Sequence, residues 1–304
     1  MYYVIKGILT DCSKQEALSG PEKYVAVLTP EEWRREIEDF RMGIDLDMVL
    51  DAGITKAEVN YDSLTGTFAI PDRNNLSGRE YRFAFACDER GIVFIDSSGV
   101  AAKLIADIQK SKKWRMPGLE RFLYDFLERI ISPDLALMEA YEKELNSIED
   151  AVQRKPERRC LDRVNDIRGE LLDLHTHYEQ LLDLSQELEE NENGFFDPDS
   201  LRYFHMFSNR VERLRDMLGS LREYTVLVRD LYQSELAAEQ NHTMTILTVT
   251  SIIFMPLTLI VGWYGMNFRY MPELYLKYSY PVLILVCIVI VVIMIAWFRR
   301  RKWL

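Results

Sequence analysis

The sequence predicts an α+β domain, followed by long stalk helices and two C-terminal transmembrane helices. Two stretches carry this prediction, because residues 240–268 and 278–298 contain no Asp, Glu, Lys or Arg. Each stretch holds close to the roughly 20 apolar residues that a helix needs to cross the hydrocarbon core of a bilayer. The region before them is rich in charge and mixes strand-like with helix-like patterns, as expected of a water-exposed region.

The overall composition argues against several classes of protein. The formal net charge of -11 and the pI near 5.0 predict no nucleic-acid partner, because binding to phosphates needs a basic surface. No glycine-rich phosphate loop, GxSxG or His/Cys pairing is present, so we do not expect an enzyme. The four cysteines lack CxxC spacing, and His175 and His177 point to different faces of a helix, which disfavours zinc sites.

Residues 1–112 are predicted to form a cytoplasmic α/β domain. Thr29 suits the N-cap of a helix that begins at Pro30, since proline fits the first helical position. Residues 61–70 are predicted to form a hairpin with its turn at residues 63–66. A second hairpin is predicted for residues 81–95, with its turn at residues 88–91.

Residues 113–240 are predicted to form a cytoplasmic helical hairpin and a stalk helix. Apolar residues such as Leu171 and Leu181, then Val211 and Leu218, recur there at helical steps. Such sustained spacing is typical of long helices that pack as in a coiled coil. One helix is predicted to run from about residue 200 to residue 264 and so to enter the membrane.

The membrane region and its basic tail set the predicted topology. The predicted boundaries are residues 241–264 for the first transmembrane helix, 265–279 for an extracytoplasmic loop, 280–298 for the second helix and 299–304 for the tail. Four basic residues follow the second helix directly: Arg299, Arg300, Arg301 and Lys302. Positive charge marks the cytoplasmic side, and the N-terminus lacks a signal-peptide pattern. We therefore predict a multi-pass protein of the cell membrane (inner or plasma membrane) with both termini in the cytoplasm.

One face of the first transmembrane helix carries small, mildly polar or methionine side chains. Its members follow one another at alternating steps of three and four residues. They are Asn241, Met244, Thr248, Ser251, Met255, Thr258, Gly262 and Gly265. Such residues suit either a close contact between helices or the lining of a pore, and the pattern alone leaves both open. Because two spans cannot enclose a pore, a pore requires a homo-oligomer with the first helix inside.

A tripeptide follows the outer end of the first transmembrane helix, and its surroundings make it informative. Gly265, Met266 and Asn267 follow Tyr264, although Gly and Asn also suit an ordinary helix end. The tripeptide stands between an FMPLT run at residues 254–258 and an MPEL run in the loop, and the chain closes with RRRKWL. This arrangement resembles the CorA family of magnesium channels. The resemblance is densest over residues 241–304, and upstream parts match in architecture.

The resemblance implies a funnel-shaped homopentamer in a lipid bilayer that passes Mg²⁺ down its electrochemical gradient, with Co²⁺ and Ni²⁺ as further candidate ions. Gly265, Met266 and Asn267 would form the selectivity filter, with Asn267 meeting the metal ion or its water shell. Family constrictions correspond to Asn241, Leu247, Met255 and Thr258. The shared face adds Met244, Thr248, Ser251 and Gly262, and Leu247 lies one residue off that face. Glu273 would attract cations to the outer mouth.

The resemblance also implies regulatory Mg²⁺ held between cytoplasmic domains. One carboxylate of that family site corresponds to Met206 here, and methionine is a poor ligand for hard cations. Asp88, Asp199 and Asp216 are candidate substitutes. We therefore expect inhibition by internal Mg²⁺ to persist through other acids.

Two alternatives remain beside the magnesium channel. The first is a relative of the same superfamily that moves Zn²⁺ or another transition metal; an intact Gly265-Met266-Asn267 favours magnesium over it. The second is a membrane-anchored coiled-coil scaffold that conducts nothing. The polar, charge-free first helix argues against the scaffold, and the oligomeric state of the purified protein would distinguish it.

Overall fold

The computed structural model describes residues 1–40, 42, 53–76, 78, 80–267, 269, 271–301 and 303. Phe268 after the tripeptide, and Lys302 and Leu304 in the basic tail, lie outside the described residues. The chain forms two compact units. The first comprises residues 1–151 and 157–229, and the second comprises residues 152–156 and 230–304.

A seven-stranded mixed sheet lies at the centre of the first unit. Its strand order is β2-β1-β3-β7-β6-β5-β4. The strands are β1 (Tyr2–Ile5), β2 (Leu9–Asp11), β3 (Tyr24–Leu28), β4 (Lys56–Val59), β5 (Leu64–Pro71), β6 (Glu80–Cys87) and β7 (Gly91–Ile95). β3 and β7 pair in parallel, with Val25 opposite Ile92, and the other neighbouring strands pair antiparallel. The parallel pair joins the N-terminal strands to the two predicted hairpins.

One predicted hairpin is confirmed and the other has its turn elsewhere. β6 and β7 form the second hairpin, in which the Asp88 carboxylate accepts the N–H groups of Arg90 and Gly91, both at 2.8 Å. The first hairpin turns at residues 60–63, so the prediction of a turn at residues 63–66 is wrong. Gly66 lies inside β5, where a Cβ atom would come within 2.6 Å of the Phe85 ring. This glycine therefore serves the close approach of neighbouring strands and not a turn.

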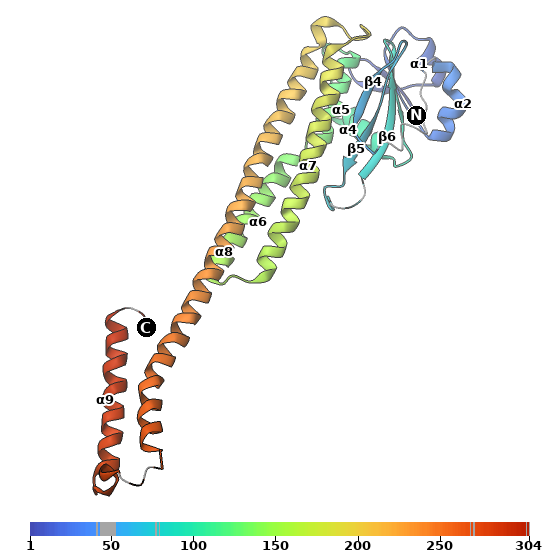
Figure 1. Ribbon diagram of the computed structural model, residues 1–304. Coiled ribbons are helices and arrows are strands. Elements are labelled where there is room, and N and C mark those ends of the chain that lie inside the picture. The colour runs from blue at the N-terminus through green and yellow to red at the C-terminus, as the bar shows by residue number, and fades with distance from the viewer. Residues whose placement is uncertain are drawn as a thin grey trace. The chain divides into compact units, whose positions relative to one another are not determined.

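Helices cover both faces of the sheet. Figure 1 shows α1 (Lys14–Ser19) and α2 (Pro30–Phe40) on one side, and α4 (Val100–Ser111), α5 (Leu119–Ile131) and α7 (Arg158–Glu190) on the other. The start of α2 is as predicted, because the Glu32 N–H donates to the Thr29 hydroxyl at 3.2 Å and the Glu32 carboxylate accepts the Thr29 N–H at 2.8 Å. This reciprocal capping gives a hydrogen-bond partner to two backbone N–H groups at the helix start.

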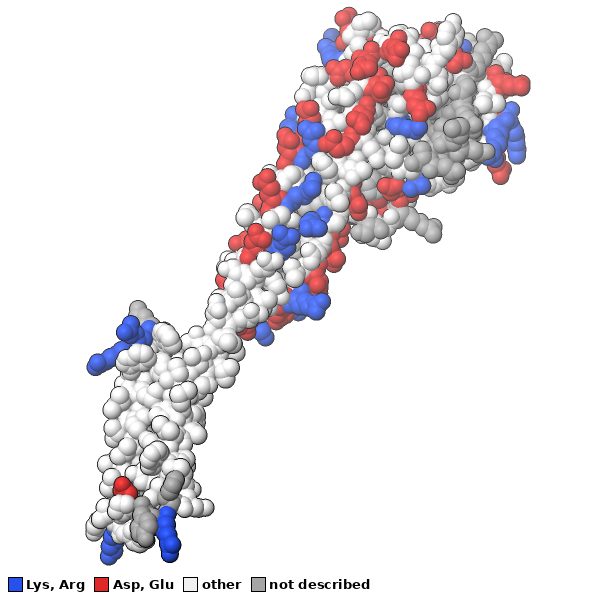
Figure 2. Space-filling model, in the orientation of Figure 1, with Lys and Arg blue, Asp and Glu red and all other residues white. Residues whose placement is uncertain are grey.

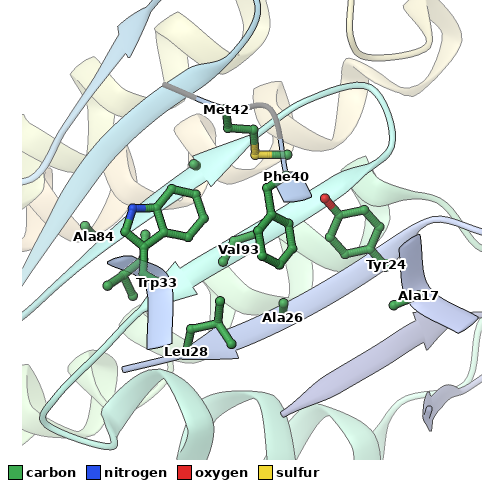
Figure 3. Close-up of a cluster of buried hydrophobic side chains, with 11 residues drawn as sticks. Ala17, Tyr24, Ala26, Leu28, Trp33, Phe40, Met42, Ala84 and Val93 are labelled. Carbon is green, nitrogen blue, oxygen red and sulfur yellow. The ribbon is translucent and has the colours of Figure 1, made fainter. Parts of the chain in front are cut away.

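Aromatic side chains fill the core on each side of the sheet. Under α2, the Trp33 and Phe40 rings stack at 5.6 Å, and the Phe40 ring lies 6.2 Å from that of Tyr24. Figure 3 shows these side chains in the core. On the opposite side, Phe126 of α5 stacks on Phe94 of β7 at 4.5 Å. Burial of large rings on both faces stabilises the sheet, since each ring removes a large apolar area from water.

Long helices complete the first unit. α6 (Asp134–Arg154) and α7 are followed by the short η1 (Pro198–Ser200) and by α8 (Arg202–Tyr264), which continues into the second unit. The apolar periodicity is confirmed, because Leu171, Leu181, Val211 and Leu218 are all fully buried. The prediction of one helix from about residue 200 to residue 264 is confirmed as well.

A buried ion pair links the sheet to the helices. The Asp134 carboxylate is fully buried and accepts two bonds from the Arg73 guanidinium, at 2.8 and 3.0 Å. The Tyr178 hydroxyl of α7 donates to the same carboxylate at 3.0 Å. Burial and this carboxylate raise the pKa of Tyr178, so the hydroxyl keeps its proton. The network therefore fixes the start of α6 against β5 and α7.

His177 lies next to this network without a hydrogen bond of normal geometry on either ring nitrogen, as far as the described residues show. Burial, and to a lesser extent the nearby Arg73 charge, lower its pKa to about 3. The folded protein therefore holds this imidazole neutral, while the unfolded chain protonates it below about pH 6.5.

The pH dependence of unfolding tests this assignment. The unfolded chain binds more protons between pH 3 and pH 6.5, so stability falls as the pH drops through that range. From pH 6.5 to about pH 5, we expect wild type to lose about 2 kcal/mol more free energy of unfolding than His177→Leu. The half-buried His175 supplies the control His175→Leu, which should behave as wild type. Identical pH profiles for wild type and His177→Leu, measured on the full chain in detergent, would contradict the assignment.

Candidate functional site

The second unit holds two helices that are long and apolar enough to cross a membrane: the C-terminal part of α8 and α9 (Ser279–Arg300). The short η2 (Pro272–Tyr275) lies between them in the chain. Figure 2 shows no charged side chains along the middle of this unit on the face in view. Most of each charge-free stretch thus lies in one of these two helices.

One face of α8 is covered within this unit. The less exposed residues between positions 241 and 264 recur at helical steps: Thr245, Val249, Ile253, Pro256, Leu257 and Ile260. Val249 is only 2% exposed. α9 also carries less exposed residues at helical steps, and the last of them, Phe298, is 1% exposed. α9 is the other long helix of this unit, so we assign the cover on this face of α8 to α9.

The face predicted from small and methionine residues lies elsewhere on α8. All of its eight members are exposed, and Met255 is 70% exposed. Six residues turn a helix by about 600°, so Met255 points about 120° away from Val249. Leu247 is also exposed, although it lies off the predicted face. The candidate pore residues are therefore accessible to a further copy of the chain or to water.

A shallow hollow indents this face, with a volume of about 650 Å³. Its lining includes four residues predicted from the spacing: Ser251, Met255, Thr258 and Gly262. It also includes Phe254, Leu259, Trp263 and the filter residue Met266. The spacing pattern did not predict Phe254, Leu259 or Trp263 at the site, because its members are small, mildly polar or methionine residues. Their positions one residue from members of the face would have identified them.

Hydroxyl groups on α8 bond to the backbone of their own helix. The Thr258 hydroxyl donates to the Phe254 carbonyl and the Ser251 hydroxyl to the Leu247 carbonyl, both at 2.9 Å. These bonds use the hydroxyl hydrogen and leave the oxygen lone pairs able to accept. Pro256 has no N–H, so the carbonyl one turn earlier loses its usual partner. The exposed face can therefore offer neutral oxygen acceptors without any charged group.

The tripeptide directly follows the last residue of α8. The Gly265 N–H donates to the Val261 carbonyl at 2.9 Å and closes the last turn, and Gly265, Met266 and Asn267 are exposed. A Cβ atom on Gly265 would lie 3.0 Å from the Val261 oxygen, closer than side chains normally approach a carbonyl. The last carbonyls of a helix have no partner within it, so this end presents oxygen atoms beside the Asn267 amide.

The loop after the tripeptide returns the chain to α9. Glu273 lies in η2 and is exposed. The Ser279 hydroxyl, at the start of α9, donates to the Glu273 backbone carbonyl. This bond ties η2 to the first turn of α9 and so limits where the Glu273 side chain can reach.

The candidate regulatory acids are spread over the first unit. Met206 is 46% exposed on α8, and Asp216 of the same helix is exposed. Burial raises the pKa of Asp88, whose carboxylate is engaged in the β6–β7 turn. Within the part of the chain that the structure describes, no three His, Cys, Asp or Glu residues come together as metal ligands. A regulatory Mg²⁺ site therefore stays a prediction.

The fold and the exposed face define a membrane protein with an α/β domain and two C-terminal spanning helices. Residues 35–300 match the model of the family described as CorA-like Mg²⁺ transporter protein. The chain belongs to this family.

Individual relatives agree with the match. The cobalt/magnesium transport protein CorA of Thermotoga maritima is 31% identical over 182 residues, which cover 60% of this chain and 52% of that protein. The match thus spans about half of that relative's length. The magnesium transport protein CorA of Wolinella succinogenes is 39% identical over 94 residues, 29% of each chain. The complete structure of the CorA magnesium transporter from Methanocaldococcus jannaschii has the same fold, with a TM-score of 0.81, 20% identity and coverage of 100% of this chain and 99% of that one.

The close approach at Gly265 gives a testable consequence. We expect Gly265→Ala to lower Mg²⁺ uptake by the reconstituted protein about tenfold, because the new methyl group displaces the Val261 carbonyl and with it the tripeptide. Gly219→Ala is the matched control, since a Cβ atom there meets nothing within 4 Å and alanine favours helix. Equal uptake by Gly265→Ala and Gly219→Ala would contradict the claim that the close approach at Gly265 positions the tripeptide.

Proposed function

We propose that this chain is one subunit of a homopentameric channel that passes Mg²⁺ across the cell membrane. The observation that carries the proposal is the exposed, charge-free face of α8, which α9 leaves uncovered and which ends in Gly265-Met266-Asn267. Family membership supports the same ion. Two spans cannot surround a pore, so copies of α8 would line it and copies of α9 would face the lipid.

The pore would alternate apolar and polar rings. Leu247 and Met255 are both at least 60% exposed and would give apolar constrictions, which can close by excluding water. Asn241, Met244, Thr248, Ser251, Thr258 and Gly262 would complete the lining. The hydroxyl and amide oxygens among them suit an ion that moves with part of its water shell.

Asn267 would act on the hydrated ion at the outer end. Mg²⁺ loses water reluctantly, so neutral acceptors that bind its water shell suit it better than direct ligands. The Asn267 amide oxygen, with the carbonyls of Gly265 and Met266, would supply such acceptors. Glu273, the one acidic residue of the loop, would attract cations toward this ring.

Orientation and driving force follow from the charges at the ends of α9. Arg299, Arg300 and Arg301 support a cytoplasmic C-terminus, and the N-terminal unit would share that side. A negative interior then favours entry by about 2.3 kcal/mol per charge for each 100 mV, about twice that for a divalent ion. Internal Mg²⁺ would also regulate the channel through acidic residues elsewhere, since Met206 replaces one carboxylate of the family site. An uptake rate that does not change with internal Mg²⁺ would contradict this regulation but not the proposed channel.

Ion uptake tests the proposal. Proteoliposomes loaded with a Mg²⁺-sensitive dye and given a negative interior should take up Mg²⁺ with wild type, and at least about tenfold more slowly with Asn267→Ala, which removes the amide from the filter. Asn74→Ala, in an exposed loop of the first unit, is the matched control and should match wild type.

Other outcomes would replace the proposal. Entry of Zn²⁺ but not Mg²⁺ would favour a transition-metal transporter. No entry of either ion, together with a monomer in solution, would favour a scaffold. Mg²⁺ entry that is unchanged in Asn267→Ala would leave a channel whose filter lies elsewhere.

A further inference from the structure

The loop between α8 and α9 carries more positive than negative charge. Residues 265–279 contain two basic residues, Arg269 and Lys277, and one acidic residue, Glu273, which gives a net charge of +1 per chain. Glu273 attracts cations, but it is only one of the three charges in the loop. The sign of the whole loop decides the potential that an approaching ion meets.

All three charges face solvent. Arg269, Glu273 and Lys277 are exposed, and among the described residues of this loop no ion pair links them. Figure 2 shows side chains of both signs in this part of the second unit. Arg269 follows the filter residue Asn267 by two positions, so its charge lies closer along the chain to the filter than that of Glu273.

The helix ends do not reverse this balance. The C-terminal end of α8 adds about half a negative charge and the N-terminal end of α9 about half a positive charge, so the two cancel to first order. Glu273 is tied by its backbone to Ser279 at that positive end of α9, which further offsets its charge. The formal charges of the loop therefore set the sign.

We propose that the outer mouth is electropositive and that Arg269 and Lys277 restrain the capture of divalent cations. This inference rests on the proposed channel. Five copies of the loop would place a net charge of +5 around the entrance. Repulsion scales with the charge of the ion, so Mg²⁺ meets twice the barrier of a monovalent cation. The restraint acts on encounter and so on the KM for Mg²⁺, and it leaves the maximal rate unchanged.

The dependence of uptake on ionic strength tests this inference. The screening length falls from about 30 Å at 0.01 M to about 8 Å at 0.15 M, so salt should weaken the repulsion. Initial Mg²⁺ uptake below the KM should therefore rise about fivefold over this range of symmetric N-methylglucamine chloride, at fixed membrane potential. Arg269→Gln and Lys277→Gln should each raise uptake at low salt and flatten the salt dependence.

Controls separate charge from structure. Arg269→Lys keeps the charge and should keep the wild-type salt dependence, whereas a structural role for the guanidinium would make it resemble Arg269→Gln. Lys113→Gln removes an exposed charge from the first unit and should change nothing. Mg²⁺ entry that falls as salt rises, or that responds to salt equally in wild type and Arg269→Gln, overturns the electropositive mouth alone. Absence of Mg²⁺ entry at every salt concentration overturns the proposed channel and this inference with it.

Discussion

The absence of water from the bilayer core is the constraint on which the account of α8 depends. Every backbone N–H and C=O there needs a partner in the protein, which only a helix supplies within a single segment. The hydroxyls of Ser251 and Thr258 meet the same demand by bonding one turn back. With its backbone satisfied apart from the carbonyl one turn before Pro256, α8 can leave one side uncovered by α9. That side holds small residues, methionines and neutral oxygens, and in a membrane it needs lipid, water or further copies of the chain. The proposed ring would meet the need and would also enclose a path for ions.

The chemistry of the uncovered face suits an ion that keeps its water. A charged group in the span would bind a divalent cation tightly and slow its release, while an entirely apolar face would exclude it. Neutral oxygens at Ser251, Thr258 and Asn267 lie between these extremes. Charge is placed in the loop and in the basic residues at the C-terminal end of α9. In the proposed channel the membrane potential would supply the driving force, and the loop would adjust how often an ion arrives.

Local patterns in the sequence were enough to predict much of the fold. The cap at Thr29, the β6–β7 hairpin and the extent of α8 follow from spacing and from residue preferences within a few positions. Contacts between distant strands could not be predicted in this way. The turn of the β4–β5 hairpin was misplaced because Gly66 leaves room for the Phe85 ring of the neighbouring strand and does not form a turn. The parallel pairing of β3 with β7 joins segments far apart in the sequence, which no local period encodes. At the candidate site, periodicity found the exposed face of α8 but not the large side chains that border its hollow, and its role as a pore lining stays a prediction.

The most direct measurement asks which face of α8 borders the ion path. Single cysteines at Thr258 and at Ile260 would be compared in a chain whose native Cys12, Cys87, Cys160 and Cys287 are replaced. Thr258 lies on the exposed face and Ile260 on the face assigned to α9. The account predicts that a charged, water-soluble thiol reagent blocks Mg²⁺ uptake by Thr258→Cys and leaves Ile260→Cys active. Block of Ile260→Cys with Thr258→Cys unaffected would contradict it, because the ions would then pass along the other face of the helix.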